Sequence, residues 1–169
     1  MVDYMFKVDF DFATNFSEEI SVYALCENAL EAIWKNEVIQ SGLDLNVDML
    51  FTLRLSDDVE IKQLNKDFRG KDKPTNVLSF PAGDEMPGME MIEMSEKYIG
   101  DVIVSVETLE REAREQNKTV HDHFVHLFIH SVLHLLGYDH IIEEEAEVME
   151  GLEIDILKTL GINNPYHKG

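Results

Sequence analysis

The sequence predicts an α/β fold of the α+β kind, in which a four-stranded mixed sheet is covered by about five helices. Three observations predict it. Strand-like segments alternate along the chain with segments whose apolar residues have helical spacing. No linker-like stretch or internal repeat separates them, so we expect a single domain over residues 1–169. A hydrophobic content of 44% is enough for one core in a chain of this length.

Four segments have the period and composition of strands. Residues 4–12 carry apolar side chains at alternate positions, which indicates a strand with one buried face. Residues 47–55 form a second strand on similar grounds. Residues 76–80 are apolar almost throughout and are followed by Pro81, so we expect a central strand there. Residues 98–104 form the fourth strand.

Two helices are expected in the N-terminal half. Ser17, followed by two glutamates, is typical of a helix N-cap with an acidic first turn. Apolar residues at helical spacing continue to about Gln40, and Gly42 ends this helix. Cys26 falls within its apolar pattern, so we expect a buried thiol rather than a reactive one. Ser56 caps a second, shorter helix.

Three further helices are expected in the C-terminal half. They follow residues 82–97, which are rich in Gly, Pro, Met and acidic residues without a clear period, and which we interpret as a long mobile loop or flap. Ser105 opens a helix with a charged outer face, and Thr119 opens one that is apolar on most of its circumference. A last amphipathic helix over residues 143–160 covers the core and ends at Gly161.

Charge is distributed unevenly over the chain. A net charge of −20 by itself argues against a nucleic-acid partner, because phosphates are bound by Lys and Arg. Residues 62–73 nevertheless have a local charge of +3. The basic residues in this stretch are Lys62, Lys66, Arg69, Lys71 and Lys73. We expect them either to meet an anionic substrate or to form a solvated loop face.

The sequence contains no sign of membrane insertion or export. No apolar segment approaches about 18 residues, the minimum for a membrane span. Residues 1–10 lack the basic start and apolar block of a secretory signal. We therefore expect a cytoplasmic protein without a membrane partner.

The most informative stretch is HSVLHLLGYDH, residues 130–140. His130 and His134 are four residues apart, so both lie on one face of a helix and can share one ion. Gly137 allows the left-handed conformation that ends a helix, so that the chain reverses and brings His140 back to the pair. Three imidazoles leave the fourth position of a tetrahedral zinc open, as in catalytic sites. Other transition metals such as nickel also suit three imidazoles.

Residues around this motif have two interpretations each. His126, one turn before His130, is either a proton relay or an outer partner of the metal ligands. His121 and His123 lie at the helix start, where we expect them to face solvent. Asp139 either orients an imidazole or caps the turn, and we favour the turn. Tyr138 either hydrogen-bonds the substrate or packs in the core or turn, and we favour packing. For the histidine pair itself, the alternative to metal binding is packing as a partly buried pair.

The spacing of the three histidines is also that of the metzincin zinc peptidases. Those enzymes place a glutamate directly after the first histidine as the general base. Here that position is Ser131, which has no useful basicity near neutral pH, so peptide hydrolysis by that mechanism lacks its base. Met149 is similar to the methionine beneath protease zinc sites, but it lies in an apolar helical stripe and is more simply explained as core.

Taken together, the chain resembles the YbeY family of bacterial metal-dependent endoribonucleases, also called rRNA maturation factors. The resemblance is carried by HSVLHLLGYDH at 130–140, by LNKDFRGKDKPTNVLSFP at 64–81 and by GDVIVS at 100–105. Two features depart from the family: Ser131 stands where the family usually has glycine, and the methionine-rich segment 82–97 is a region that we expect to vary.

The resemblance implies the activity and the ligands. It implies one zinc ion on His130, His134 and His140, and a functionally required arginine at Arg69. It also implies a single-strand-directed endoribonuclease that acts in maturation of the 16S rRNA 3′ end and in ribosome quality control. Its partners are then ribosomal RNA and ribosomal proteins or the small subunit. A non-enzymatic ribosome-associated factor that binds RNA remains an alternative.

The residue types suit such a reaction. Zinc lowers the pKa of bound water, and a guanidinium at Arg69 suits the charge that develops on phosphoryl oxygens. Either a water molecule or the RNA 2′-hydroxyl is the nucleophile. We expect Lys66, Lys71 and Lys73 to position the RNA backbone without reading bases. Hydroxyl and amide groups that we expect to line the cleft belong to Thr75, Asn76 and Ser79.

Overall fold

The computed structural model describes residues 6–17, 19–44, 46–82 and 96–166. In chain order the elements are β1 (Phe6–Phe12), α1 (Val22–Lys35), α2 (Glu37–Ser41), β2 (Asp48–Ser56), α3 (Asp58–Arg69), β3 (Val77–Pro81), β4 (Glu96–Ser105), α4 (Val106–Glu115), α5 (Val120–Leu135) and α6 (Glu143–Thr159). The sheet has the strand order β1-β2-β4-β3. β1, β2 and β4 are parallel, and β3 is antiparallel to β4. The predicted four-stranded mixed sheet is confirmed.

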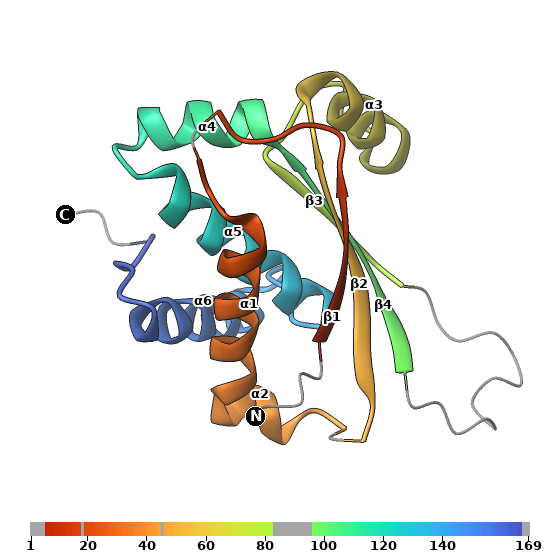
Figure 1. The fold of residues 1–169 in the computed structure, drawn as a ribbon. Coiled ribbons are helices and arrows are strands. Elements are labelled where there is room, and N and C mark those ends of the chain that lie inside the picture. Colours follow the sequence, from red (N-terminus) through yellow and green to blue (C-terminus); the bar gives the residue numbers. More distant parts are fainter. Residues whose placement is uncertain (1–5, 18, 45, 83–95, 167–169) are drawn as a thin grey trace, which may run out of the picture.

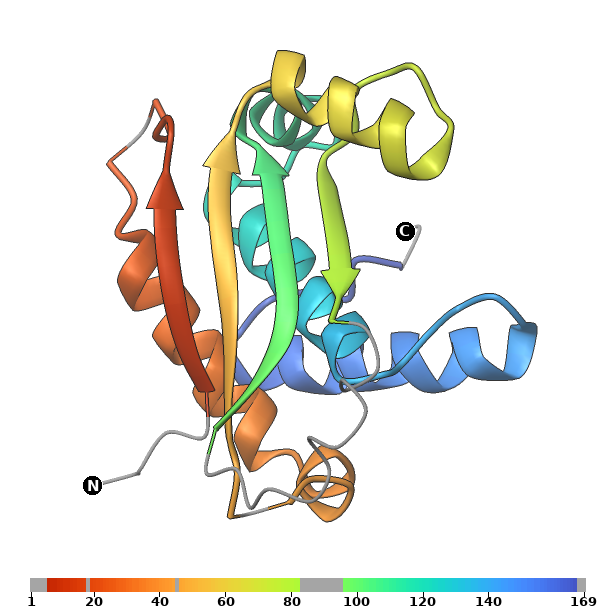
Figure 2. The same cartoon turned by 90° about the vertical axis from the view of Figure 1, so that its right-hand side faces the viewer.

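Helices cover one face of this sheet. In Figure 1, α1, α5 and α6 lie on one side of the strands. Figure 2 shows the other side, where no helix of the described residues runs along the strands. The burial of β2 agrees, because Met49, Phe51, Leu53 and Leu55 are buried while the residues between them are only partly covered. Alternate side chains of a strand point to opposite faces, so this pattern places the core on the helix side.

The third strand lies at the edge of the sheet, so the prediction of a central strand is wrong. Within the part of the chain that the structure describes, β3 pairs with β4 alone. Its apolar character has another cause: Val77 packs against the main core, whereas Leu78 and Phe80 lie on the opposite face. There the ring of Phe80 meets that of Phe68 from α3 at 5.4 Å. Pro81 has no N–H to donate, which an edge position tolerates.

The expected first helix is two helices, so the structure has six in the described residues. α1 begins after Ser21, whose hydroxyl accepts from the Ala24 amide at 3.4 Å, and not at Ser17. Ser17 instead donates its hydroxyl to Glu110 of α4. Asn36 interrupts the helix, because its side chain accepts from two amides of α2 at 3.0 and 3.2 Å and so caps a new helix.

The other boundaries are close to those predicted. Asp57, one residue after the expected Ser56, caps α3, and Ser105 and Thr119 cap α4 and α5 as expected. β4 begins at Glu96, and most of the segment interpreted as a flap, residues 83–95, lies outside the described residues.

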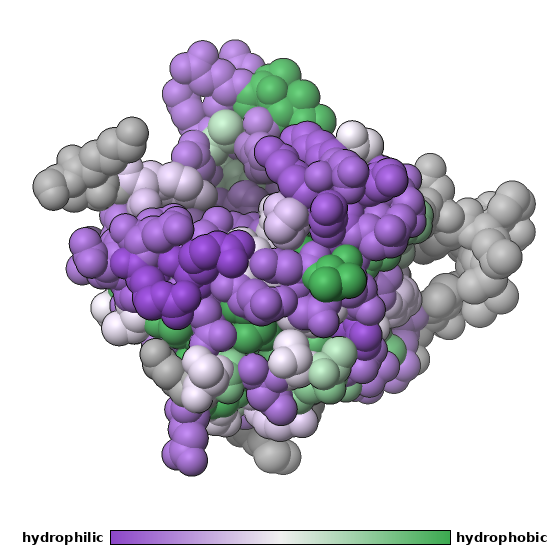
Figure 3. Space-filling model, turned by 90° about the horizontal axis from the view of Figure 1, so that it is seen from above, coloured by the Kyte–Doolittle hydropathy of each residue, from purple (hydrophilic) through white to green (hydrophobic). Residues whose placement is uncertain are grey.

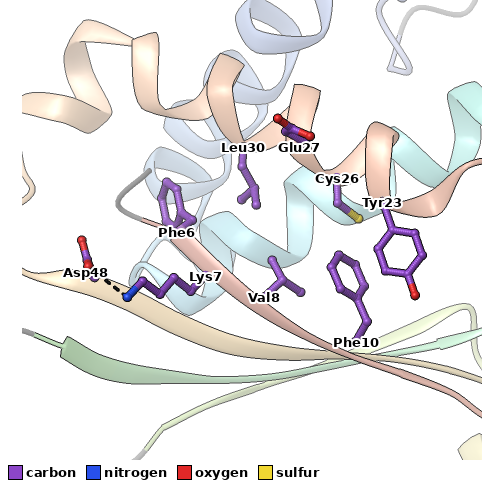
Figure 4. A pocket seen from close by; sticks show the side chains of 9 residues that line it. All are labelled: Phe6, Lys7, Val8, Phe10, Tyr23, Cys26, Glu27, Leu30 and Asp48. Carbon is purple, nitrogen blue, oxygen red and sulfur yellow. Dashed lines mark ion pairs between the residues drawn. The ribbon is translucent and has the colours of Figure 1, made fainter. Parts of the chain in front are cut away.

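An open pocket of about 730 Å³ lies between β1 and α1, lined by apolar side chains together with Lys7, Glu27 and Asp48 (Figure 4). At one side of it Lys7 pairs with Asp48 at 3.4 Å. Cys26 points into this region and is buried, and burial raises the pKa of its thiol. The expectation of a buried core thiol is confirmed. In the part of the chain that the structure describes, none of the helices has the length and apolar character needed to cross a membrane.

Helix α5 is the centre of the fold and positions the site. It packs against β3, β4, α1, α4 and α6. Gly100 of β4 has a φ of 141°, and a Cβ there would lie 2.8 Å from Leu135 at the end of α5 and 2.3 Å from the Phe80 carbonyl oxygen. Only glycine allows the end of α5 to approach β3 and β4 this closely. The end of the molecule formed by α3 and α4 is mostly hydrophilic, as Figure 3 shows from above.

Candidate metal centre

The three histidines of residues 130–140 meet at the end of α5. His130 and His134 lie one turn apart on this helix. Gly137, with a φ of 104°, then reverses the chain, and its amide donates to the His134 carbonyl at 3.0 Å. The ring centroids of His130 and His140 are 5.5 Å apart, and His134 lies 4.8 and 4.9 Å from them. The local sequence therefore builds the cluster as predicted.

The donor set of this cluster fits a divalent transition metal. One ring nitrogen from each histidine falls within a group whose atoms all lie within 4.8 Å of one another. His130 and His134 are partly buried, whereas His140 is exposed. Burial lowers the pKa of His134, and the adjacent rings of His130 and His140 lower it further. A neutral imidazole is the form that binds a metal, so this environment favours ligation.

A buried carboxylate from α6 supports this cluster. Glu153 is fully buried, and its Oε2 accepts from Nδ1 of His130 at 3.1 Å. Its Oε1 accepts from Nε2 of His126 at 2.8 Å and from the Tyr166 hydroxyl at 2.8 Å. Burial raises the pKa of Glu153, but the hydrogen bonds from His126 and His130, together with the positive charge of these rings, outweigh it and bring the pKa to about 2. Glu153 is thus an anion that the site holds deep in the protein.

Sequence reasoning did not single out Glu153 or Tyr166. The available signal for Glu153 was a charged residue within the apolar stripe of α6, between Leu152 and Ile156, which are both buried. Tyr166 follows α6 in the C-terminal tail, and nothing in the local pattern connects it with α5. Among the described residues His126 is not part of the three-histidine group, and its Nε2 faces Glu153 instead.

A cleft of about 780 Å³ connects the histidines with the end of α3. Arg69, Lys71 and Ser79 line it together with all three histidines, Asp139 and Tyr166. Arg69 donates from Nη2 to the Ser79 carbonyl at 2.8 Å, and its guanidinium lies 5.5 Å from the centre of the Phe80 ring. The cleft therefore combines the candidate metal ligands with two basic side chains from the segment 64–81.

Two of the lysines expected in the cleft lie outside its lining. Lys66 and Lys73 are exposed, and neither is among the lining residues. The Lys73 carbonyl accepts from the buried Asn65 side chain at 2.8 Å, so this part of the loop has a structural role. Thr75 and Asn76 line the cleft as expected.

The prediction that His123 faces solvent is wrong, whereas His121 is exposed as expected. His123 is 3% exposed, and its Nε2 lies 2.9 Å from Glu112 Oε1, which also accepts from Asn76 Nδ2 at 2.9 Å. The hydrogen bond from His123 is the largest cause that lowers the pKa of Glu112. Glu112 of α4 therefore links His123 of α5 to Asn76, which lines the cleft.

The remaining neighbours of the motif have packing or turn roles. Met149 is fully buried in the core. Asp139 accepts from the His140 amide at 2.7 Å, in agreement with a turn, and Tyr138 packs against the core. Ser131 is fully buried and does not line the cleft, and its hydroxyl has no partner among the described residues. It is therefore not placed to act as a base.

Comparisons with known proteins agree with the motifs. A family model described as endoribonuclease YbeY matches residues 12–161. A protein named endoribonuclease YbeY from Alteromonas mediterranea is 48% identical over 79% of this chain and 80% of its own length. One of the same name from Francisella tularensis subsp. novicida is 47% identical over 78% of this chain and 75% of its own. The solution structure of TM1509 from Thermotoga maritima matches with a TM-score of 0.55 and 26% identity, over 97% of this chain and 100% of that one.

Proposed function

The chain belongs to the YbeY family of endoribonucleases, and we propose that it is a zinc-dependent endoribonuclease that cleaves single-stranded RNA. The observation that carries the proposal is that three imidazoles suited to a metal and one arginine line the same cleft. We assign the catalytic roles to His130, His134, His140 and Arg69. Residues 1–169 act as a single hydrolase domain in this proposal.

The histidines hold the metal through one ring nitrogen each. When bound, a divalent ion supplies an activated water molecule or polarises a phosphoryl oxygen. Zinc is the metal that we propose, and nickel or another transition metal fits the same three donors. His130 offers Nε2, because its Nδ1 faces Glu153.

Arg69 supplies positive charge from the opposite side of the cleft. Phosphodiester cleavage concentrates negative charge on the phosphoryl oxygens, and a planar guanidinium matches two of those oxygens with parallel N–H groups. The side chain is exposed, and among the described residues its guanidinium donates from Nη2 alone, to the Ser79 carbonyl. That bond and the Phe80 ring fix the guanidinium while other N–H groups remain for a phosphate.

The basic segment around Arg69 guides the RNA backbone. Lys71 lines the cleft, and Lys66 and Lys73 extend the positive charge along the exposed surface beside it. Such contacts hold phosphates without reading bases. We propose ribosomal RNA as the substrate, in maturation of the 16S rRNA 3′ end and in ribosome quality control, with ribosomal proteins or the small subunit as partners and the cytoplasm as the compartment. The family membership supports this assignment.

One experiment separates this function from a peptidase and from a non-enzymatic RNA-binding factor. Purified protein is incubated with single-stranded RNA and with casein, each with and without a chelator. We expect cleavage of RNA only, lost on chelation and restored by zinc. Casein cleavage would support the peptidase. RNA binding without cleavage in the zinc-loaded protein would support the non-enzymatic factor.

A further inference from the structure

We propose that Glu153 is a positioning residue that fixes the ring of His130 with its proton on Nδ1, so that Nε2 carries the lone pair that binds the metal. The inference rests on the proposed function, because it assigns His130 to a metal. It assigns a role to a residue of α6 that lies outside both sequence motifs of the site.

The first argument is the burial of a charged group. Glu153 is 0% exposed, and its neighbours on α6, Leu152 and Ile156, are buried apolar residues. An ionised carboxylate in such surroundings is costly unless hydrogen-bond donors surround it. The structure provides three donors, so both carboxylate oxygens are satisfied. Two of these donors are imidazoles of α5, and one of them is a candidate metal ligand, so the buried charge is tied directly to the histidine cluster.

The second argument concerns the proton on His130. An imidazole that donates from one nitrogen to a carboxylate must carry its lone pair on the other when the ring is neutral. The contact between His130 Nδ1 and Glu153 Oε2 at 3.1 Å therefore leaves Nε2 for the metal. Within the described residues, the ring nitrogens of His134 and His140 form no hydrogen bond with the protein. Glu153 thus fixes one ligand of the three.

The third argument is the support of Glu153 itself. His126, one turn before His130 on α5, donates to Oε1 at 2.8 Å, and Tyr166 donates to the same oxygen at 2.8 Å. The rings of His126 and Tyr166 are 5.5 Å apart and nearly perpendicular. The C-terminal tail thereby restrains a carboxylate that the central helix and α6 share. His126 and Tyr166 therefore support Glu153, and neither belongs to the three-histidine group of the described residues.

The principal test is the affinity of the metal-free protein for zinc, measured by competition with a chelating dye. Glu153→Gln keeps the shape and removes the charge. We expect it to weaken zinc binding by about 10–100-fold, the usual effect of losing such a partner. Glu147→Gln is the matched control, because it makes the same change at an exposed position of α6 and leaves the affinity as it was.

A second readout does not involve the metal. Nitrogen NMR of the metal-free protein, with His130 assigned by its Ala variant, reports which ring nitrogen carries the proton. We expect the Nδ1–H form in the unmodified protein and a mixture of the two neutral forms in Glu153→Gln. Tyr166→Phe removes one of the three hydrogen bonds to Glu153 and is expected to weaken zinc binding by a smaller but measurable factor than Glu153→Gln, about two- to tenfold.

Two results would overturn the inference: unchanged zinc affinity in Glu153→Gln, or an unchanged proton position on His130. If Glu153→Gln does not fold, Tyr166→Phe decides, and zinc affinity equal to that of the unmodified protein refutes the role. Failure of the proposed function has a different signature. It appears as zinc-loaded, unmodified protein that does not cleave RNA, whatever the affinity of the variants.

Discussion

Replacement of Arg69 by alanine tests the proposed chemistry most directly. The change removes a donor aimed at developing negative charge, for which losses of about 10²–10³-fold in kcat are usual, or roughly 3–4 kcal/mol of transition-state stabilisation. The cost in stability is smaller. The bond to the Ser79 carbonyl is worth about 0.5–1.5 kcal/mol and the contact with the Phe80 ring about 0.5–1 kcal/mol. Together these lower Tm by roughly 2–10 °C, so the variant remains folded at 25 °C.

The assay is cleavage of a single-stranded RNA at saturating zinc, with zinc content and Tm measured on the same samples. Arg69→Lys keeps the charge without the planar fork and is expected to recover only part of the rate. Lys62→Ala is the control, since it removes a basic side chain from α3 outside the cleft lining. Zinc content should be the same in all of them. A kcat for Arg69→Ala equal to that of the unmodified protein would refute the role of the guanidinium.

Three further outcomes are expected. His134→Ala should lose both bound zinc and RNA cleavage, and full zinc occupancy by elemental analysis would contradict the three-histidine site. Gly100→Ala should lower the free energy of unfolding by roughly 3 kcal/mol in urea titrations, because its positive φ and its contacts below 3 Å leave no room for a Cβ; Gly151→Ala, where a Cβ meets nothing within 4 Å, should not destabilise. The pKa of Glu60 is lowered chiefly by its bond to Arg54, so its stabilisation is present above the unfolded pKa and is lost as the pH falls through the folded pKa. Urea titrations at pH 6 and pH 3 measure how far the free energy of unfolding falls between the two values. We expect a smaller fall for Glu60→Gln than for the unmodified protein.

Local sequence information predicted the elements of this fold better than their arrangement. Caps such as Ser105 and Thr119 act within three residues, so their positions follow from the sequence itself. The break at Asn36 was missed because apolar spacing continues across it, and only the two hydrogen bonds of its side chain mark a new helix. The order of the strands depends on contacts between distant segments, which no local pattern records.

The same distinction holds for the site. His130, His134 and His140 lie within one short segment, and a helix followed by a glycine turn is enough to bring them together. Glu153 and Tyr166 reach the cluster from later elements, through a helix that packs on α5 and a tail that returns to it. A charged residue inside the apolar stripe of α6 was the one visible sign. Its partners required the tertiary structure.

The position of β3 at the edge of the sheet, and not at its centre as predicted, shapes the site. A central strand would have neighbours on both sides, whereas among the described residues β3 pairs with β4 alone and its other edge has no partner strand. Ser79 on this strand lines the cleft, and its carbonyl holds Arg69 from α3. The histidines come from α5, which packs against the same strand. An edge strand can therefore lie between the arginine and the candidate metal ligands while both remain open to a substrate as large as RNA.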